Sequence, residues 1–265
     1  MRKNKVFLIL ISLLLFLFSN CSYPRLASSN PKSTNVDFSD LEQKYGVNFV
    51  FSNVRDTWDL VNYKVLTENE KKAAKVIMTR ILEIYPENFL KKINLQNIVL
   101  VKELKFRDDF IAAVPDNYMS SIFFSMDSSY TDNYKYHTVI HELNHYIEYY
   151  LWNDYYYKWP EYAKLYDGTN LGGKTAYDNK KTDYYSYTPD LTGFLNKYSK
   201  LASEEDRSEI IAFYFCPIGN EHNNLISKCK NDKIMKDKTV LMLSLYESLG
   251  FKDLLKSFYK ELESK

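Results

Sequence analysis

The pentapeptide His141–His145, which reads HELNH, is the most informative stretch of this sequence. It lies in a run from Tyr134 to Tyr150 that we predict to be one long helix. Residues four apart share one face of a helix, so the two imidazoles can converge on a single zinc ion. The glutamate after the first histidine then points towards the water molecule on the metal. Half of the chain's four histidines lie in this pentapeptide, which favours a zinc site over a chance match.

His137 lies on the same face of the predicted helix, one turn before the first histidine of the motif. It is eight residues from His145, which is about 12 Å along a helix axis. Zinc–nitrogen bonds are only about 2 Å long. We therefore expect His137 to have a structural role or to contact the residues that bind the metal, without a bond to the metal itself.

The third zinc ligand has to come from elsewhere, because Glu148 stands where the third residue after His145 falls and no histidine follows at short spacing. The best candidates lie at the start of a predicted helix over residues 203–215, where Glu205 and Glu209 are one turn apart. One carboxylate would bind the metal, and the other would accept a hydrogen bond from a ligand histidine. Two solvated carboxylates at a helix N-terminus are the alternative.

The segment Gly193–Phe213, GFLNKYSKLASEEDRSEIIAF, resembles the region after HExxH in a group of bacterial zinc-binding metallopeptidases that are often lipoproteins. It also looks like the same region of the lethal-factor and Pro-Pro endopeptidase families. All of these are zincins of the gluzincin type. The resemblance implies that Glu205 is the third ligand, that Glu209 lies behind the ligands and that Tyr198 faces the metal. It further implies an α+β, zincin-like metalloprotease domain, in which a small mixed sheet packs on the HExxH helix and a mainly helical half follows.

Two features depart from the pattern of these families. Ser208 stands where alanine is usual, and a long insertion separates His145 from Glu205. If the register shifts by one residue, Glu204 becomes the ligand. The alternative for Tyr198 is that it has no role at the metal and is simply one of the chain's 24 tyrosines.

The resemblance implies a zinc endopeptidase with one catalytic Zn²⁺. The zinc ion activates a water molecule, Glu142 takes its proton as the general base, and Tyr198 donates a hydrogen bond to the developing oxyanion. The peptide or protein substrate is expected to pair with an edge strand before the HExxH helix, at Ser121–Met126. A surface lipoprotein that keeps the fold but acts as an adhesin or other binding protein is the alternative. The intact Glu142 favours the enzyme.

Residues 1–20 resemble a lipoprotein signal peptide. Three basic residues precede the apolar run Val6–Phe18, which is too short to span a bilayer comfortably. Cys21 follows, and we expect it to carry the lipid; a plain secretory signal with an ordinary thiol here is the alternative. Residues 21–38 are rich in Ser, Asn and Pro and predict a flexible tether, and 39–265 would form the zinc metallopeptidase-like domain. We expect an exported bacterial lipoprotein, bound by its lipid to the membrane of the cell envelope or surface.

Export changes the interpretation of the two remaining cysteines, Cys216 and Cys229. Disulfides persist in exported proteins, so we expect a bridge between them across the polar segment 217–228. Two buried free thiols are the alternative.

The composition fits one catalytic domain. The 265 residues include 35 Lys+Arg and 34 Asp+Glu, and the formal net charge of +1 gives no reason to expect a nucleic-acid partner. The hydrophobic fraction of 45% excludes general disorder. We expect a monomer. The tyrosine-rich stretches Tyr155–Tyr157 and Tyr184–Tyr187 are expected to pack over the domain, with a dedicated binding surface as the alternative.

The remaining patterns predict helices and short strands in alternation. A capping box begins the first predicted helix, and β-branched and aromatic runs predict three strands of one sheet. The predicted helices cover residues 67–85, 134–150, 203–215 and 236–265, with a short one near 160–165, and the predicted strands cover 97–101, 111–114 and 122–125.

Overall fold

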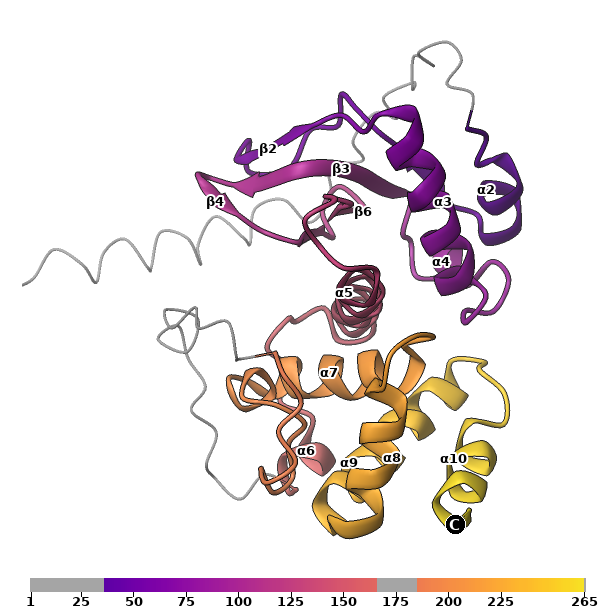
Figure 1. The fold of residues 1–265 in the computed structure, drawn as a ribbon, viewed down its shortest axis with the longest axis vertical. Helices are drawn as coiled ribbons and strands as arrows, with labels where there is room; N and C mark the ends of the chain where they lie inside the picture. Colours follow the sequence, from indigo (N-terminus) through magenta and orange to yellow (C-terminus); the bar gives the residue numbers. More distant parts are fainter. Residues whose placement is uncertain (1–35, 166–184, 265) are drawn as a thin grey trace, which may run out of the picture. The chain divides into compact units, whose positions relative to one another are not determined.

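The computed structural model describes residues 36–165 and 185–264. The predicted signal peptide, the expected lipidation site Cys21 and most of the predicted tether lie outside these residues. Asn35–Lys265 forms one compact unit. Within it, the helix α5 (Asp132–Trp152) lies between a sheet and the helices of the C-terminal half (Figure 1). The prediction of a mixed α+β fold with a small sheet is confirmed.

The sheet contains six strands in the described part of the chain: β1 (Asn48–Val50), β2 (Val61–Lys64), β3 (Asn97–Phe106), β4 (Asp109–Phe110), β5 (Ala113–Asp116) and β6 (Ser121–Ser125). Four of them follow the order β1-β3-β6-β5, and β2 and β4 pair with the second half of β3. β1 and β6 run parallel to β3, whereas β5 runs antiparallel to β6. The central strands are buried on both faces, so their sequences, IVLV and SIFFS, do not alternate with exposed polar residues.

The strand predicted to receive the substrate, Ser121–Met126, is not at the edge of the sheet. It forms β6, which pairs with β3 on one side and with β5 on the other, so the edge strand is β5. Ser125 N donates to Ala112 O (2.8 Å). The alternation of an antiparallel ladder then turns the backbone N–H and C=O of Ala113 and the C=O of Pro115 away from β6. Proline is tolerated there because its missing N–H is not needed by the sheet.

α3 (Glu68–Leu82) covers part of the sheet and begins with the predicted capping box. Thr67 N donates to Glu70 Oε2 (2.6 Å), and the Thr67 side chain accepts from Glu70 N. The helix ends three residues earlier than predicted. Its buried apolar residues, which include Ile77 and Ile81, belong to the core that also contains the sheet and α5.

α5 is two residues longer at each end than its prediction, because both ends are capped. Thr131 Oγ1 accepts from Tyr134 N (3.2 Å), and Asn153 ends the helix in the left-handed conformation (φ 52°). Buried apolar residues hold one face of α5 in the core; they include Ile140, Leu143 and Ile147. The face with the HExxH histidines contacts α7 (Ser203–Phe215), whose bounds match the prediction.

The short predicted helix near residue 160 is present as α6 (Pro160–Ala163). α8 (Glu221–Asn231) was not predicted, because its sequence, EHNNLISKCKN, is mostly polar and buries few apolar side chains. Six further short elements were also missed: α2 (Ser39–Tyr45), α4 (Phe89–Lys92), the 3-10 turn η2 (Tyr198–Lys200) and the strands β1, β2 and β4.

The single helix predicted from residue 236 to the end is wrong. Two helices, α9 (Lys233–Ser248) and α10 (Leu254–Glu263), occupy this region. The chain turns between them at Gly250 (φ 107°) and Asp253 (φ 58°), two backbone conformations that a helix does not contain. None of the helices in the described residues is both long and apolar enough to cross a bilayer.

Candidate metal centre

Helices α5 and α7 bring together three atoms that could bind a metal ion: His141 Nε2, His145 Nε2 and Glu205 Oε2. The two imidazole nitrogens are 3.0 Å apart, and the carboxylate oxygen lies 3.0 Å from His141 and 3.2 Å from His145. We call these three atoms the ligand triangle. All three side chains are buried or nearly so, with side-chain exposures of 6%, 11% and 8%.

The ligand triangle has the dimensions that one zinc ion requires. With bonds of about 2.0–2.1 Å, a tetrahedral zinc ion holds its ligand atoms about 3.3 Å apart. The three sides of the triangle are nearly equal and close to this value. Two imidazoles and one carboxylate also form a known catalytic zinc ligand set, which leaves a fourth position for water or substrate. The residues present therefore fit a zinc ion.

The electrostatics of the three side chains also suit a cation. Burial would raise the pKa of the Glu205 carboxyl, but His145 and His141 hold it well below its usual range. Burial would lower the pKa of His141, yet the carboxylates of Glu205 and Glu209 raise it well above its usual value. The carboxylates thus attract positive charge to the point where the nitrogen lone pairs converge. Zinc can supply this charge in place of protons.

The structure brings Glu205 into the ligand triangle and leaves Glu204 outside it. Glu204 is buried on the same turn of α7, and burial raises its pKa. Its carboxylate lies near Ser203 Oγ (3.5 Å) and belongs to no group of potential metal ligands in the described residues. Of the two neighbouring glutamates, the structure therefore brings Glu205 rather than Glu204 to the histidines.

Two consecutive residues of α7 reach the second ring nitrogens of the histidines. Glu209 Oε1 lies 2.9 Å from His141 Nδ1, although the N–H bond is not aimed directly at the oxygen. Ser208 Oγ lies 3.2 Å from His145 Nδ1. A ligand histidine usually donates this second N–H to a neighbouring oxygen, which fixes its tautomer and its orientation. Glu209 was expected to accept a hydrogen bond from a ligand histidine; its carboxylate lies within 2.9 Å of His141 Nδ1 but without the alignment of a hydrogen bond.

The contact between Ser208 and His145 was not predicted; in the sequence, Ser208 is only a departure from the usual alanine. Ser208 Oγ also accepts from Asn144 Nδ2 (3.0 Å), the residue before His145. Asn144 Oδ1 in turn accepts from Tyr246 of α9 (2.9 Å). A polar residue in place of alanine one turn from a predicted ligand was the signal available in the sequence.

Behind this contact lies a buried ion pair. Arg207 donates to both oxygens of Glu148, with two distances of 2.7 Å, and both side chains are almost fully buried. The Arg207 guanidinium also lies over the ring of Trp152, which stacks on Tyr157 at 4.6 Å. Part of the aromatic segment after α5 therefore packs around a buried cation.

Two tyrosines lie beside the ligand triangle. The Tyr198 ring is 5.8 Å from the His141 ring, measured between centroids, which places this predicted residue next to the site. Tyr185 lies 4.7 Å from the Tyr198 ring. Tyr185 was not predicted to lie near the site, and Tyr184 lies outside the described residues.

The predicted disulfide between Cys216 and Cys229 is not formed. Both are buried free cysteines with separate neighbours: Cys216 Sγ contacts Ile218 O (3.5 Å) and Cys229 Sγ contacts Thr239 Oγ1 (3.4 Å). The segment between them is mainly the helix α8 rather than a flexible loop, and it keeps the two thiols apart. Burial raises the pKa of both thiols to about 12.

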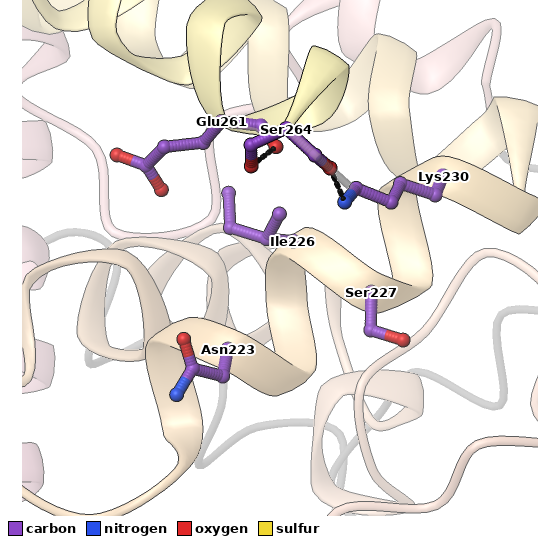
Figure 2. A pocket seen from close by; sticks show the side chains of 6 residues that line it. All are labelled: Asn223, Ile226, Ser227, Lys230, Glu261 and Ser264. Carbon is purple, nitrogen blue, oxygen red and sulfur yellow. Dashed lines mark hydrogen bonds between the residues drawn. The ribbon is translucent and has the colours of Figure 1, made fainter.

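The pocket in Figure 2 lies away from these residues. It is lined from α8 and α10 by Asn223, Ile226, Ser227, Lys230, Glu261 and Ser264. None of them belongs to the ligand triangle or contacts it in the described structure, so this pocket has no part in the candidate metal centre.

The fold is similar to that of a solved protein. A crystal structure of a "putative zinc-binding metallo-peptidase" from Bacteroides caccae ATCC 43185 superposes with a TM-score of 0.52, over 84% of this chain and 87% of that chain. The two sequences are 16% identical, so the similarity concerns the fold. No protein-family model matches this chain, and no curated protein matches its sequence. The chain is therefore similar to that protein in fold.

Proposed function

We propose that this protein is a zinc-dependent endopeptidase of the gluzincin type. The observation that carries the proposal is the ligand triangle, whose three atoms are 3.0 to 3.2 Å apart. The general base expected beside such a site, Glu142, directly follows the first ligand on α5. The similarity to a metallopeptidase fold supports the proposal.

Zinc in the ligand triangle would polarise the scissile carbonyl and lower the pKa of a water molecule. Glu142 is half-buried and would take the proton of the attacking water and pass it to the leaving amine. Burial raises the pKa of Glu142, with His145 and His141 opposing, which suits a group that must both accept and return a proton. Tyr198 would donate a hydrogen bond to the developing oxyanion.

We propose β5 as the strand that receives the substrate. β5 contacts α5, the helix that carries the histidines, and one edge of β5 has no neighbouring strand in the described sheet. An extended peptide could donate to the outward C=O groups of Ala113 and Pro115 and accept from the outward N–H of Ala113. Main-chain pairing of this kind would hold peptides of varied sequence.

The N-terminal sequence supports export and anchoring. Basic residues, the apolar run Val6–Phe18 and the following Cys21 fit a lipoprotein held at a bacterial membrane by its lipid. We propose that the protein acts there as a monomer on peptide or protein substrates, without a nucleic-acid partner.

The proposal is tested by measuring bound zinc and peptide cleavage on the same preparations. We expect the purified protein to carry one zinc ion and to cleave members of a mixed-sequence peptide library, and Glu142→Gln to carry zinc without cleaving. Zinc binding without any difference in cleavage between the two proteins would refute the enzyme and indicate a binding protein that keeps the fold.

A further inference from the structure

His137 lies between two carboxylates that come from different helices. Its Nε2 donates to Glu209 Oε1 of α7 (2.9 Å), and its Nδ1 lies 3.1 Å from Glu221 Oε2 of α8. The ring is largely buried, with a side-chain exposure of 12%. The ring lies 5.6 Å from the ring of Phe213, measured between centroids, and the two ring planes are at 85° to each other. His137 is therefore held on both sides and has little freedom to turn.

The first of these carboxylates is the one that contacts a proposed zinc ligand. Glu209 Oε1, which accepts from His137, also lies 2.9 Å from His141 Nδ1. Glu209 Oε2 accepts from Asn196 Nδ2 (2.5 Å). The Glu209 side chain is only 1% exposed, so water does not replace a lost partner easily. The direction of the carboxylate is thus set by His137 on one oxygen and by Asn196 on the other.

The second carboxylate fixes His137 itself. Glu221 is the first residue of α8, and its Oε1 accepts from Asn133 Nδ2 of α5 (2.9 Å). Asn133 and His137 lie one turn apart on α5 and hold the two oxygens of Glu221 between them. The contacts therefore run from the start of α8 through His137 and Glu209 to His141.

We propose that His137 is a positioning residue of the metal centre: it holds the Glu209 carboxylate against His141, so that the Nε2 lone pair of His141 points into the ligand triangle. The contact between Glu209 and His141 is short but not aligned, so a small rotation of the carboxylate would remove it. This inference rests on the proposed function, because it takes His141, His145 and Glu205 as the zinc ligands. His137 acts on the metal only through Glu209.

The experiment measures the zinc dissociation constant by competition with a chromophoric chelator, and the visible absorption of the Co²⁺-substituted protein. His137→Phe keeps an aromatic ring but removes both polar contacts. We expect it to weaken zinc binding by about 10- to 100-fold, the usual effect of removing support behind a ligand, and to change the Co²⁺ spectrum. His137→Gln can still donate to Glu209 and should restore part of the affinity and the wild-type spectrum.

His222→Phe is the matched control. His222 also bridges two groups, Tyr214 O (2.6 Å) and Glu261 Oε2 (2.5 Å), but neither contacts the ligand triangle. We expect His222→Phe to bind zinc as the wild type does. Circular dichroism of the metal-free proteins separates loss of folding from loss of binding. If His137→Phe does not fold, His137→Leu, which also removes both polar contacts, takes its place.

The outcomes separate this inference from the function on which it rests. If both His137 variants bind zinc with wild-type affinity, or if His222→Phe weakens binding as much as they do, the positioning role is refuted and the proposed function stands. If the wild type binds no zinc, or if Glu205→Gln retains it, the ligand assignment fails, and the role of His137 fails with it.

Discussion

Ser208 Oγ lies 3.2 Å from His145 Nδ1, on the side of the ring opposite to the Nε2 atom of the ligand triangle. The hydroxyl is held by Asn144, which belongs to the HExxH motif itself. The two histidines are therefore supported unequally, since a charged carboxylate contacts His141 and a neutral hydroxyl contacts His145. Hydrogen bonds to charged groups are about twice as strong as neutral ones.

This relationship predicts that Ser208→Ala weakens zinc binding by about tenfold, at the lower end of the range for such contacts. Ser208→Thr keeps the hydroxyl and should retain most of the affinity. Competition with a chromophoric chelator measures both constants. Equal affinity of Ser208→Ala and the wild type would show that the contact does not support the ligand.

Neighbouring glutamates on α7 should differ in their importance for the metal. Glu205→Gln removes the negative charge of a proposed ligand. Substituting a residue that only hydrogen-bonds to a ligand weakens metal binding by up to roughly 100-fold, so we expect a larger loss of zinc affinity for Glu205→Gln. Glu204→Gln leaves the triangle intact and should bind zinc normally. Metal analysis after dialysis checks both, and the reverse order would assign the ligand to Glu204.

The buried pair of Arg207 and Glu148 should matter for folding. The side chains of Arg207 and Glu148 are only 1% and 2% exposed. Glu148→Ala removes the carboxylate that binds two nitrogens of the guanidinium, and Arg207 stays charged without it. We expect a loss of about 3–5 kcal/mol in the free energy of unfolding, measured in urea on metal-free protein. Asp40→Ala, which breaks the exposed pair with Lys75, is the control and should cost about 0–1 kcal/mol. Similar losses in both would contradict the prediction.

Pro115 should limit how the proposed substrate pairs with β5. Its C=O faces outwards but it has no N–H, so one hydrogen bond of the edge is missing. Pro115→Ala supplies the donor. In a Glu142→Gln background, we expect it to tighten binding of a peptide that the wild type cleaves by about two- to tenfold. Pro217→Ala, an exposed proline away from the sheet, should have no effect. Unchanged binding to Pro115→Ala would argue against pairing at this edge.

The free thiols of Cys216 and Cys229 predict that reducing agents do not change stability. A bridge across this segment would contribute about 3 kcal/mol, so its absence is measurable. We expect the same midpoint of thermal unfolding with and without dithiothreitol, and both thiols to react after unfolding in denaturant. A lower midpoint under reducing conditions would mean that a bridge forms.

Local patterns predicted those elements that depend on local physics. Thr67 and Glu70 form a capping box within four residues of each other, and α3 begins where they predict. α8 and the turn at Gly250 were missed for the opposite reason: α8 buries few apolar residues, and its place in the core comes from packing on α7 and α9. Cys216 and Cys229 suggested a bridge, but spacing in the sequence carries no information about the distance across a helix.

Local spacing is enough to place His141 and His145 on one helix face with Glu142 beside them, because the 3.6-residue period of the helix is a local property. It left open which glutamate completes the site, and the resemblance to known families pointed to Glu205. The folded arrangement is needed to bring Glu205 into the triangle, to place Ser208 and His137 around it and to make β5 the edge strand. Those outcomes depend on how α7 and α8 pack against α5 and on the order of strands in the sheet, which are set by contacts between residues far apart in the chain.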